Sequence, residues 1–447
     1  MKTRRDAEVF LPKEGENFDV IVVGGGPAGL GAAIAAAKQG VKTLVLEARG
    51  FFGGVAPVLH WMNVNRLLLN GESRGGVHDY FVNKILSYGP KVSVPGKVNV
   101  VDGDGLDIHP DYLCLAAFEC LEEVKCKYRV HSPVVGVEKQ GNQVTGVRVM
   151  TKDKIETFKA KVIVDASGDG DVAYHAGAEM VKGRETDGHF MGVALGFVLS
   201  NADTDKFFPY IADHRDEMNK AIYDLGGKEG FALSSFYSWD KATVPGFVSV
   251  NNGGLAGVGI IDATNPDHLT LAERFGIQIA VDFVEIAHRL AIPGLENCHL
   301  ARVGADMGVR ETRRIVGDYV MTLEDAIQGI EFEDVISRRY GAIDPAGIKE
   351  DKDYHKVPMV SGHAFPYRAL LPKGIEGLLV TGRCSSATHL GFACGRSMGN
   401  MMGLGQAAGI AAVLSARDGI APRKLDVKRI QNILVDMGVE LLKNPNA

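Results

Sequence analysis

The sequence lacks the features that several large classes of protein require. No uninterrupted apolar run reaches about 18 residues, the length a membrane-spanning helix needs. No run of Lys and Arg is longer than about a pair, and the formal charge of −6 offers no basic surface to a nucleic acid. We therefore expect neither a membrane span nor a nucleic-acid partner.

Cysteine is also scarce. The chain has six cysteines in 447 residues and no CxxC pair, which argues against a disulfide framework, a zinc site and a cysteine-ligated iron–sulfur cluster. We predict no metal site. The first fifteen residues contain an Arg pair but no apolar segment, so we expect no secretion signal and a cytoplasmic protein.

Glycine, in contrast, is abundant. The 55 glycines are roughly twice the usual share of about 7%, and they form clusters such as Gly24-Gly25-Gly26 instead of a regular repeat. This pattern excludes collagen and indicates many close backbone approaches. With 46% hydrophobic residues, the chain can form a large core, most plausibly in two domains.

The N-terminal segment has the pattern of a dinucleotide site. Residues 18–23 (FDVIVV) predict a buried strand, and a glycine turn then leads into the helix-favouring stretch 30–40 (LGAAIAAAKQG). Gly24 permits the tight turn, Gly26 lets a pyrophosphate approach the backbone, and Gly29 lets helix and strand pack closely. A second strand at residues 42–46 ends in Glu47, whose carboxylate can accept hydrogen bonds from ribose hydroxyls.

Both FAD and NAD fit this motif, and the carboxylate of Glu47 disfavours NADP. The position of the motif near the N-terminus and the Gly53-Gly54 pair after Glu47 favour FAD. The predicted dinucleotide contacts in this segment are Gly24, Gly26, Pro27, Ala28, Gly29, Glu47, Ala48, Arg49, Gly53, Gly54 and Val55.

A second unit near the other end of the chain makes FAD the better choice. Residues 377–381 (GLLVT) predict a strand, followed by a glycine-rich loop at 390–399 and a helix of small residues at 400–414. This unit resembles the C-terminal flavin-binding segment of FAD-dependent oxidoreductases, in which the helix N-terminus faces the flavin pyrimidine. The contacts that this resemblance implies are Gly382, Arg383, Gly399, Asn400 and Met401.

The resemblance covers about residues 18–409. Residues 162–171 (VIVDASGDGD), 310–315 (RETRRI) and 382–389 (GRCSSATH) resemble one family of FAD-dependent oxidoreductases, which includes relatives of the heterodisulfide reductase flavoprotein. It implies an α/β fold: a Rossmann-like, glutathione-reductase-like FAD-binding domain at 1–179 and 371–447, with an inserted α+β substrate domain at 180–370. The further FAD contacts are Val134, Ala166, Ser167, Gly168, Asp171 and Arg310.

Four side chains are candidates for catalysis. The resemblance would place His389 beside the flavin ring, where an imidazole can move a proton near neutral pH. Arg396 can clamp a carboxylate or polarise a carbonyl. His363 and Tyr367 are further candidates, because the segment that carries them returns toward the FAD domain. For each residue the alternative is a purely structural role.

Two local structures are also predicted. Arg310, Arg313 and Arg314 are expected to form a basic cluster on a helix, paired with Glu311 or Asp318. Thr270 and Glu273 have the spacing of a capping box before a helix of about twenty residues.

These patterns predict an enzyme that moves a hydride between a small polar organic molecule and noncovalently bound FAD. The alternatives are a flavin-dependent hydratase or isomerase without net redox change, and a non-catalytic FAD-binding protein. The electron acceptor is not predicted, and a homodimer is expected only because it is the commonest assembly.

Overall fold

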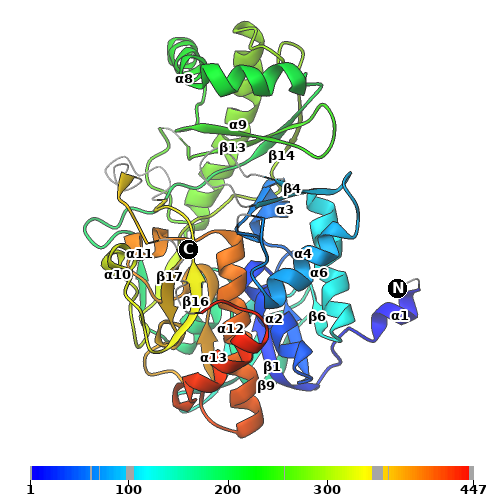
Figure 1. Cartoon of the computed structure of the whole chain (residues 1–447), viewed down its shortest axis with the longest axis vertical. Helices are drawn as coiled ribbons and strands as arrows, with labels where there is room; N and C mark the ends of the chain where they lie inside the picture. The colour runs from blue at the N-terminus through cyan, green and yellow to red at the C-terminus, as the bar shows by residue number, and fades with distance from the viewer. Residues whose placement is uncertain are drawn as a thin grey trace.

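The structure is a computed structural model that describes residues 3–60, 63–69, 71–96, 105–255, 257–344, 356–360 and 362–441. Figure 1 shows a large lower body, which holds both ends of the chain, and a smaller upper lobe built from its middle. This arrangement is a mixed α/β fold with a parallel sheet at its centre, as the sequence predicts.

The central sheet of the body has seven strands in the described part of the chain, and five of them run parallel. The parallel strands follow the order β6-β2-β1-β9-β18, and β7 and β8 add an antiparallel meander to β9. The strands are β1 (Asn17–Val23), β2 (Thr43–Leu46), β6 (Lys127–Arg129), β7 (Val134–Gln140), β8 (Gln143–Met150), β9 (Ile155–Asp165) and β18 (Leu378–Val380).

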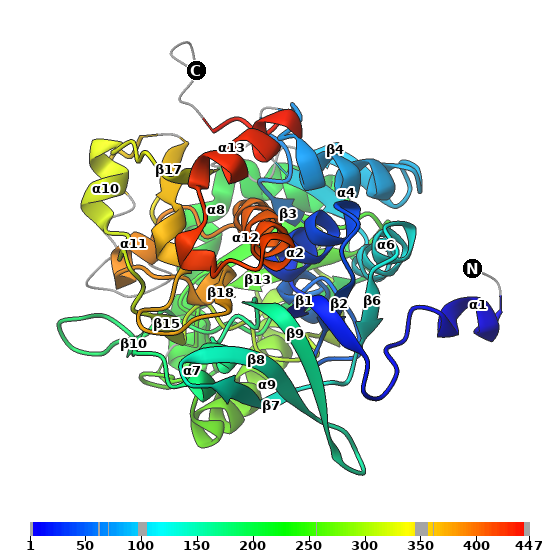
Figure 2. The ribbon, with the colours of Figure 1, turned by 90° about the horizontal axis from the view of Figure 1, so that it is seen from below.

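Both faces of this sheet are covered, which explains why its strands read as continuous apolar runs. One face packs against helices of the body, as Figure 2 shows from below. The opposite face packs against the meander and α7 (Asp171–Ala176). The covering helices are α2 (Pro27–Lys38), α4 (Gly76–Leu86), α6 (Pro110–Glu123) and α12 (Met398–Asp418).

Helices α2 and α12 pack against each other without intervening side chains. A Cβ atom on Gly405 of α12 would lie 1.8 Å from the carbonyl oxygen of Ala28, and one on Gly31 of α2 would lie 2.2 Å from that of Met402. No real side chain tolerates such distances, so glycine is required at both positions. The close packing brings the first turn of α2 against the second turn of α12, and Figure 2 shows the two helices side by side.

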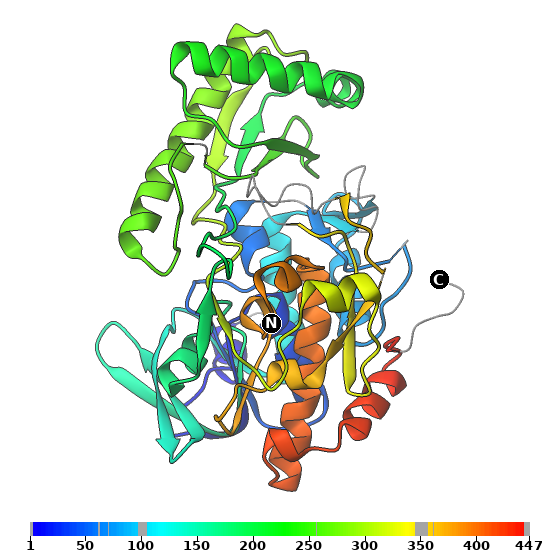
Figure 3. The same ribbon diagram turned by 90° about the vertical axis from the view of Figure 1, so that its left-hand side faces the viewer.

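The upper lobe has its own core. An antiparallel sheet in the order β12-β13-β11-β14 carries two long helices, and Figure 3 shows them standing away from the body. Helix α8 is interrupted at His214, whose backbone is not helical. The elements are β11 (Phe197–Ser200), α8 (Thr204–Glu229), β12 (Tyr237–Lys241), β13 (Val248–Asn252), α9 (Pro266–Arg289) and β14 (His299–Val303).

Smaller elements join the lobes and complete the body. Three small sheets pair β10 with β15, β16 with β17, and β3 and β4 with β5. Their strands are β3 (Asn63–Asn65), β4 (Ser93–Gly96), β5 (Gly105–Ile108), β10 (Met180–Lys182), β15 (Arg313–Ile315), β16 (Val335–Arg339) and β17 (His363–Pro366). The remaining helices are α1 (Arg4–Glu8), α3 (Val55–Leu59), α10 (Leu323–Gln328), α11 (His389–Ala393), α13 (Val427–Asp436), η2 (Tyr367–Leu370), η3 (Gly382–Cys384) and η4 (Pro422–Lys424).

Two local predictions are wrong. Residues 313–315 form strand β15, not a helix, because they pair with the distant β10. Helix α9 begins at Pro266 with Asn265 as its cap, one turn before the predicted capping box. Within the helix, the Thr270 hydroxyl donates to the carbonyl oxygen of Pro266 (2.8 Å), and the Glu273 carboxylate accepts from the N–H of Met307 (2.7 Å).

Candidate flavin and substrate site

The first part of the site is the glycine turn between β1 and α2. Gly24 has a φ of +97°, and a Cβ there would lie 2.3 Å from the carbonyl oxygen of Ala166. A Cβ on Gly29 would lie 1.8 Å from the carbonyl oxygen of Gly24. Gly26 caps α2, and the nearest atom to a Cβ there is 3.7 Å away, so the backbone before Pro27 is open to a ligand. The amide groups of the first turn of α2 are the donors that a pyrophosphate needs.

Glu47 connects this turn to the end of β2. One carboxylate oxygen accepts from the N–H of Gly25 (2.6 Å) and the other accepts from the N–H of Arg49 (2.8 Å). Each oxygen has a second lone pair, so the carboxylate retains the capacity to accept ribose hydroxyls. These bonds hold Glu47 at the edge of the glycine turn, where the motif requires it.

The residues after Glu47 close over the same turn. The N–H of Gly53 donates to the carbonyl oxygen of Gly25 (2.9 Å), and Gly54 caps α3, which begins at Val55. Ala48 follows directly on Glu47. Arg49 extends outward, and its Nε donates to Asp306 at 3.0 Å. The N-terminal contacts predicted from the sequence therefore lie together, with the Arg49 guanidinium at their rim.

The segments after β9 and β18 form the second wall. The N–H of Ala166 donates to the carbonyl oxygen of Val23 (2.8 Å), and Ser167 donates to Asp165 (2.7 Å). Gly382 has a φ of +82°, and a Cβ there would lie 3.0 Å from the Cβ of Ala28. A Cβ on Gly168 would lie 3.0 Å from the guanidinium of Arg383.

The glycine turn after β1, the segment from Glu47 to Val55 and the segments after β9 and β18 together form a cradle. Three of the predicted FAD residues lie toward its periphery. Val134 is the first residue of the edge strand β7. Asp171, in the first turn of α7, pairs with Arg313. Arg310 donates to the carbonyl oxygens of Gly192 (2.5 Å) and Asn252 (3.2 Å), and so ties β13 of the upper lobe to the body.

The first turn of α12 completes the cradle. Gly399 is required there, because a Cβ would lie 1.9 Å from the carbonyl oxygen of Arg66. Asn400 donates to the carbonyl oxygens of Tyr340 (2.6 Å) and Gly395 (2.9 Å), and Met401 is buried beside it. Among the described residues, the Oδ1 of Asn400 and the hydroxyl of Ser397 are buried without a hydrogen-bond partner. Such orphaned groups fit a polar ligand at this helix start, and the cradle as a whole fits FAD.

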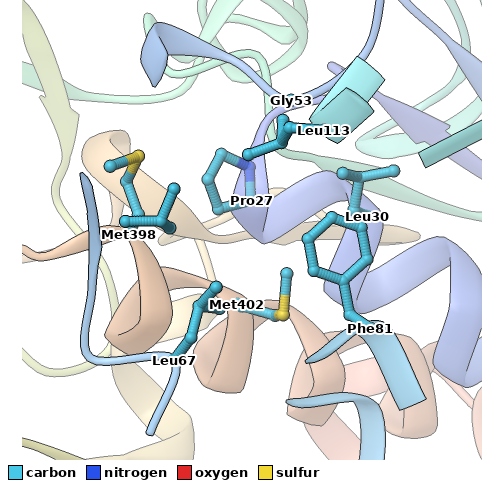
Figure 4. A pocket seen from close by; sticks show the side chains of 9 residues that line it. Pro27, Leu30, Gly53, Leu67, Phe81, Leu113, Met398 and Met402 are labelled. Atoms are coloured by element: carbon cyan, nitrogen blue, oxygen red, sulfur yellow. The ribbon is translucent and has the colours of Figure 1, made fainter. Parts of the chain in front are cut away.

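A pocket between α2 and α12 is not the substrate site. Figure 4 shows that Pro27, Leu30, Phe81, Met398 and Met402 point into it, and all of its lining residues are apolar. Its cavity volume of about 10 Å³ accommodates about one water molecule. The cavity is a small apolar gap where α2 and α12 meet α4, α6 and the turn at Gly53.

His389 belongs to a buried charged network. Its Nδ1 lies 3.0 Å from a carboxylate oxygen of Glu311, and its backbone N–H donates to Glu185 (2.8 Å). Glu311 also pairs with Arg314, and all three side chains of the His389–Glu311–Arg314 network are fully buried. A carboxylate at Nδ1 fixes the imidazole tautomer that carries its proton there, leaving Nε2 as the nitrogen that can exchange a proton.

Arg396 and Arg310 contribute positive charge near each other. Arg396 pairs with Asp344 and also donates to its backbone carbonyl. Burial, with a smaller contribution from the charge of Arg396, lowers the pKa of Arg310 to about 10. Arg310 therefore remains charged at neutral pH, and its guanidinium would attract an anionic group that binds beside it.

His363 and Tyr367 lie deep in the body. His363 is 1% exposed, and burial, followed by the charges of Arg339 and Arg338, lowers its pKa to about 3. The Tyr367 hydroxyl donates to the carbonyl oxygen of Pro422 (2.9 Å). That bond directs the hydroxyl toward the segment before α13.

Glu311 has a larger role in the site than the sequence predicts. The sequence predicts it only as a structural partner of the neighbouring arginines, and the pairing with Arg314 is confirmed. The contact with His389 joins residues 78 positions apart, so no local pattern predicts it. The local signal is that Glu311 is the one carboxylate among three closely spaced arginines, Arg310, Arg313 and Arg314.

An FAD-binding oxidoreductase fold is defined by three features of this site. They are the glycine-rich turns after β1 and β18, the Glu47 carboxylate after β2, and the first turn of α12. A family model described as FAD dependent oxidoreductase matches residues 19–434, so the chain belongs to this family. The description of the family names FAD as the cofactor and oxidoreduction as the chemistry, as the sequence predicts.

Curated relatives match shorter segments. A digeranylgeranylglycerophospholipid reductase from Thermoplasma acidophilum is 30% identical over 204 residues, which cover 42% of this chain and 48% of that protein. An NADH dehydrogenase from Bacillus subtilis is 46% identical over 68 residues, 15% of this chain and 12% of that protein. The chain thus matches less than half the length of these relatives.

A solved structure supports the fold. The geranylgeranyl bacteriochlorophyll reductase-like protein from Thermoplasma acidophilum aligns with a TM-score of 0.51 and 16% identity, over 94% of this chain and 84% of that one. At this identity the likeness concerns the fold alone. Within the described ranges, none of the helices combines the length and apolarity needed to cross a membrane.

Proposed function

We propose that this enzyme transfers a hydride between a small polar organic substrate and noncovalently bound FAD, with His389 exchanging the proton. The observation that carries the proposal is the fully buried His389 imidazole, whose Nδ1 is held 3.0 Å from Glu311. When bound, FAD supplies the centre that accepts or donates the hydride.

The residues that would hold FAD are those of the cradle. The first turn of α2 would bind the pyrophosphate, and Glu47 would bind the ribose. The N-terminus of α12, with Gly399, Asn400 and Met401, would face the pyrimidine ring, and its partial positive charge would stabilise negative charge there.

His389 acts as acid and base. In substrate oxidation, its Nε2 accepts the proton that leaves the O–H or N–H group of the substrate. In reduction it returns that proton. The Glu311 carboxylate stabilises the imidazolium that forms, because the positive charge develops 3.0 Å from it between two fully buried side chains.

Arg396 orients the substrate. Its planar guanidinium can bind a carboxylate or a carbonyl through two parallel hydrogen bonds. The charges of Arg396 and Arg310, with Asp344 as a nearby counter-ion, favour a substrate that carries an anionic group.

The test is an anaerobic titration of the purified holoprotein with hydroxy acids, amino acids and sugars, followed by the flavin absorbance. Bleaching by one class identifies a substrate and supports net oxidation. Turnover without bleaching would support a hydratase or isomerase, and a protein without flavin that refuses added FAD would overturn the proposal.

A matched pair of variants tests the role of His389. His389→Asn should bind FAD normally but slow flavin reduction by about 10²-fold or more. His214→Asn removes an exposed histidine of α8 in the upper lobe and should leave the rate unchanged. Equal rates in the wild type and His389→Asn would exclude His389 as the acid and base.

The inserted substrate domain at 180–370, the cytoplasmic location and the homodimer are part of this proposal. The separate core of the upper lobe supports the domain, whereas the residues of α10, β16 and β17 pack into the core of the body. The electron acceptor is left open.

A further inference from the structure

Arg339, the last residue of β16, is a fully buried cation without a counter-ion in the described part of the chain. Its Nε donates to the carbonyl oxygen of Gly395 at 3.3 Å. Among the described residues, neither Nη1 nor Nη2 has a hydrogen-bond partner. The guanidinium lies over the ring of Phe365, 4.9 Å from its centroid.

Two other buried arginines have the partners that Arg339 lacks. Arg338, the preceding residue, pairs with Glu331 and donates to the carbonyl oxygens of Gly362 (2.7 Å) and Leu441 (2.7 Å). Arg314 pairs with Glu311. A buried charge without such partners is strongly unfavourable, so the presence of Arg339 at this position requires an explanation.

The surroundings of Arg339 do not neutralise it. His363, its register partner on β17, is held neutral, because burial lowers the imidazole pKa to about 3. Burial also lowers the pKa of the Arg339 guanidinium to about 10, with a small opposite effect from Cys394. The guanidinium therefore remains charged at neutral pH, next to groups that are not anionic.

Arg339 is adjacent to the start of α12. The carbonyl oxygen of Gly395 accepts from Arg339 and also from the side chain of Asn400 in the first turn of that helix. A Cβ on Gly395 would lie 3.0 Å from the Cβ of Arg339 and 3.2 Å from the Nδ2 of Asn400. An anionic group bound at this helix start would therefore supply the negative charge that Arg339 lacks.

We propose that Arg339 raises the reduction potential of bound FAD, its charge adding to that of the α12 N-terminus; this rests on the placement of the pyrimidine ring proposed above. Uptake of two electrons and one proton leaves one negative charge on the pyrimidine ring, and the electrons come from the substrate. Arg339 acts through the first turn of α12 and does not touch the reacting atoms. Its charge is uncompensated before reduction and compensated after it.

The experiment compares midpoint potentials of holoprotein variants, measured by anaerobic titration with dithionite and reference dyes. The neutral variants Arg339→Met and Arg339→Gln should shift the equilibrium at least tenfold toward oxidised FAD, about 30 mV for a two-electron couple. Arg339→Lys, which retains the charge, should stay within threefold of the wild type, which is about 15 mV. Arg338→Met, which removes a neutralised arginine of the same strand, should leave the potential unchanged.

Stability provides a second readout. Both neutral variants should unfold at a temperature equal to or above that of the wild type, because they remove an uncompensated buried charge. Unchanged potentials in Arg339→Met and Arg339→Gln would overturn the proposal, as would equal shifts in these variants and in Arg339→Lys. Failure of both neutral variants to fold would also overturn it, since the charge would then serve the fold. Neither measurement uses a substrate, so the result is independent of whether His389 is the acid and base.

Discussion

The imidazole of His389 and the carboxylate of Glu311 meet at 3.0 Å, although they come from segments separated by 78 positions and are both fully buried. Glu311 also accepts from the N–H of Met191 (3.0 Å) and pairs with Arg314. One carboxylate therefore orients the candidate catalytic residue and neutralises a buried arginine.

Glu311→Gln should reduce the free energy of unfolding by about 3 kcal/mol, because the fully buried Arg314 guanidinium would retain only the half-exposed Glu185, 3.3 Å away, as a counter-ion. Urea unfolding of the holoprotein measures the loss. The control, Glu138→Gln, removes the charge of a half-exposed carboxylate that lies 3.9 Å from Arg148. It should leave the free energy of unfolding unchanged within error. Equal stabilities of Glu311→Gln and the wild type would contradict a structural contribution of the network.

Gly405→Ala should destabilise the protein by about 3 kcal/mol or more and lower its FAD content, since the added methyl would lie 1.8 Å from the carbonyl oxygen of Ala28. Flavin absorbance per protein and thermal unfolding measure the two effects. The control is Gly227→Ala on α8, where no atom lies within 4 Å of the new Cβ. In that variant the free energy of unfolding should rise by up to about 1 kcal/mol, because alanine has a higher helix propensity than glycine.

His363 should make the protein sensitive to acid. Its pKa falls from 6.5 to about 3 on folding, mainly through burial, so between these values the unfolded chain binds one more proton than the folded chain. The contribution to stability is present above pH 6.5 and is lost at about 1.4 kcal/mol per pH unit as the pH falls toward 3. Urea unfolding at pH 7 and pH 5 measures the effect. Between these pH values the free energy of unfolding should fall by about 2 kcal/mol less in His363→Gln than in the wild type.

The matched control for this pH effect is His299→Gln, which replaces an exposed histidine of β14. Its loss of stability between pH 7 and pH 5 should equal that of the wild type. If His363→Gln showed the same pH dependence as His299→Gln, the buried imidazole would not be the source.

The six cysteines should resist thiol reagents in the native state. Five are buried, and burial raises the pKa of Cys394 and Cys120 to about 12 and that of Cys114 and Cys298 to about 11. A disulfide-exchange reagent at pH 8 should therefore modify at most the half-buried Cys114 within minutes. The same assay in guanidinium chloride should count six thiols, and rapid native reaction of Cys384 or Cys394 would reopen a thiol–disulfide function for the flavin loop.

Much of the cofactor cradle could be predicted because its constraints are local. The strands that end before Gly24 and before Glu47 are confirmed within about a residue, and the helix between them is confirmed but begins at Pro27, three residues before the predicted stretch. The strand at 378–380 is also confirmed, and α12 begins two residues before its predicted start. A backbone that approaches a phosphate closely requires glycines at a fixed spacing. Because that spacing is a local pattern, it can be recognised in the sequence.

The segment around Glu311 could not be predicted in the same way. Arg313 and Arg314 have no helical or strand preference strong enough to decide their structure, and pairing with β10 across more than 130 residues decided it. The burial of Arg339 and His363 likewise depends on how β16 and β17 pack against α12, which involves no short-range pattern. The residues assigned to FAD binding and catalysis stay predictions until the variants are measured.

The contact between α2 and α12 also governs the order in which the protein matures. Helix α2 ends at residue 38, whereas its partner begins at residue 398, about 360 residues later in synthesis. At a translation rate of about 5–20 residues per second, the first half of the cradle waits roughly 20 to 70 seconds for the second. Because the cradle needs both helices, we expect complete FAD binding only after α12 has been synthesised and has packed against α2.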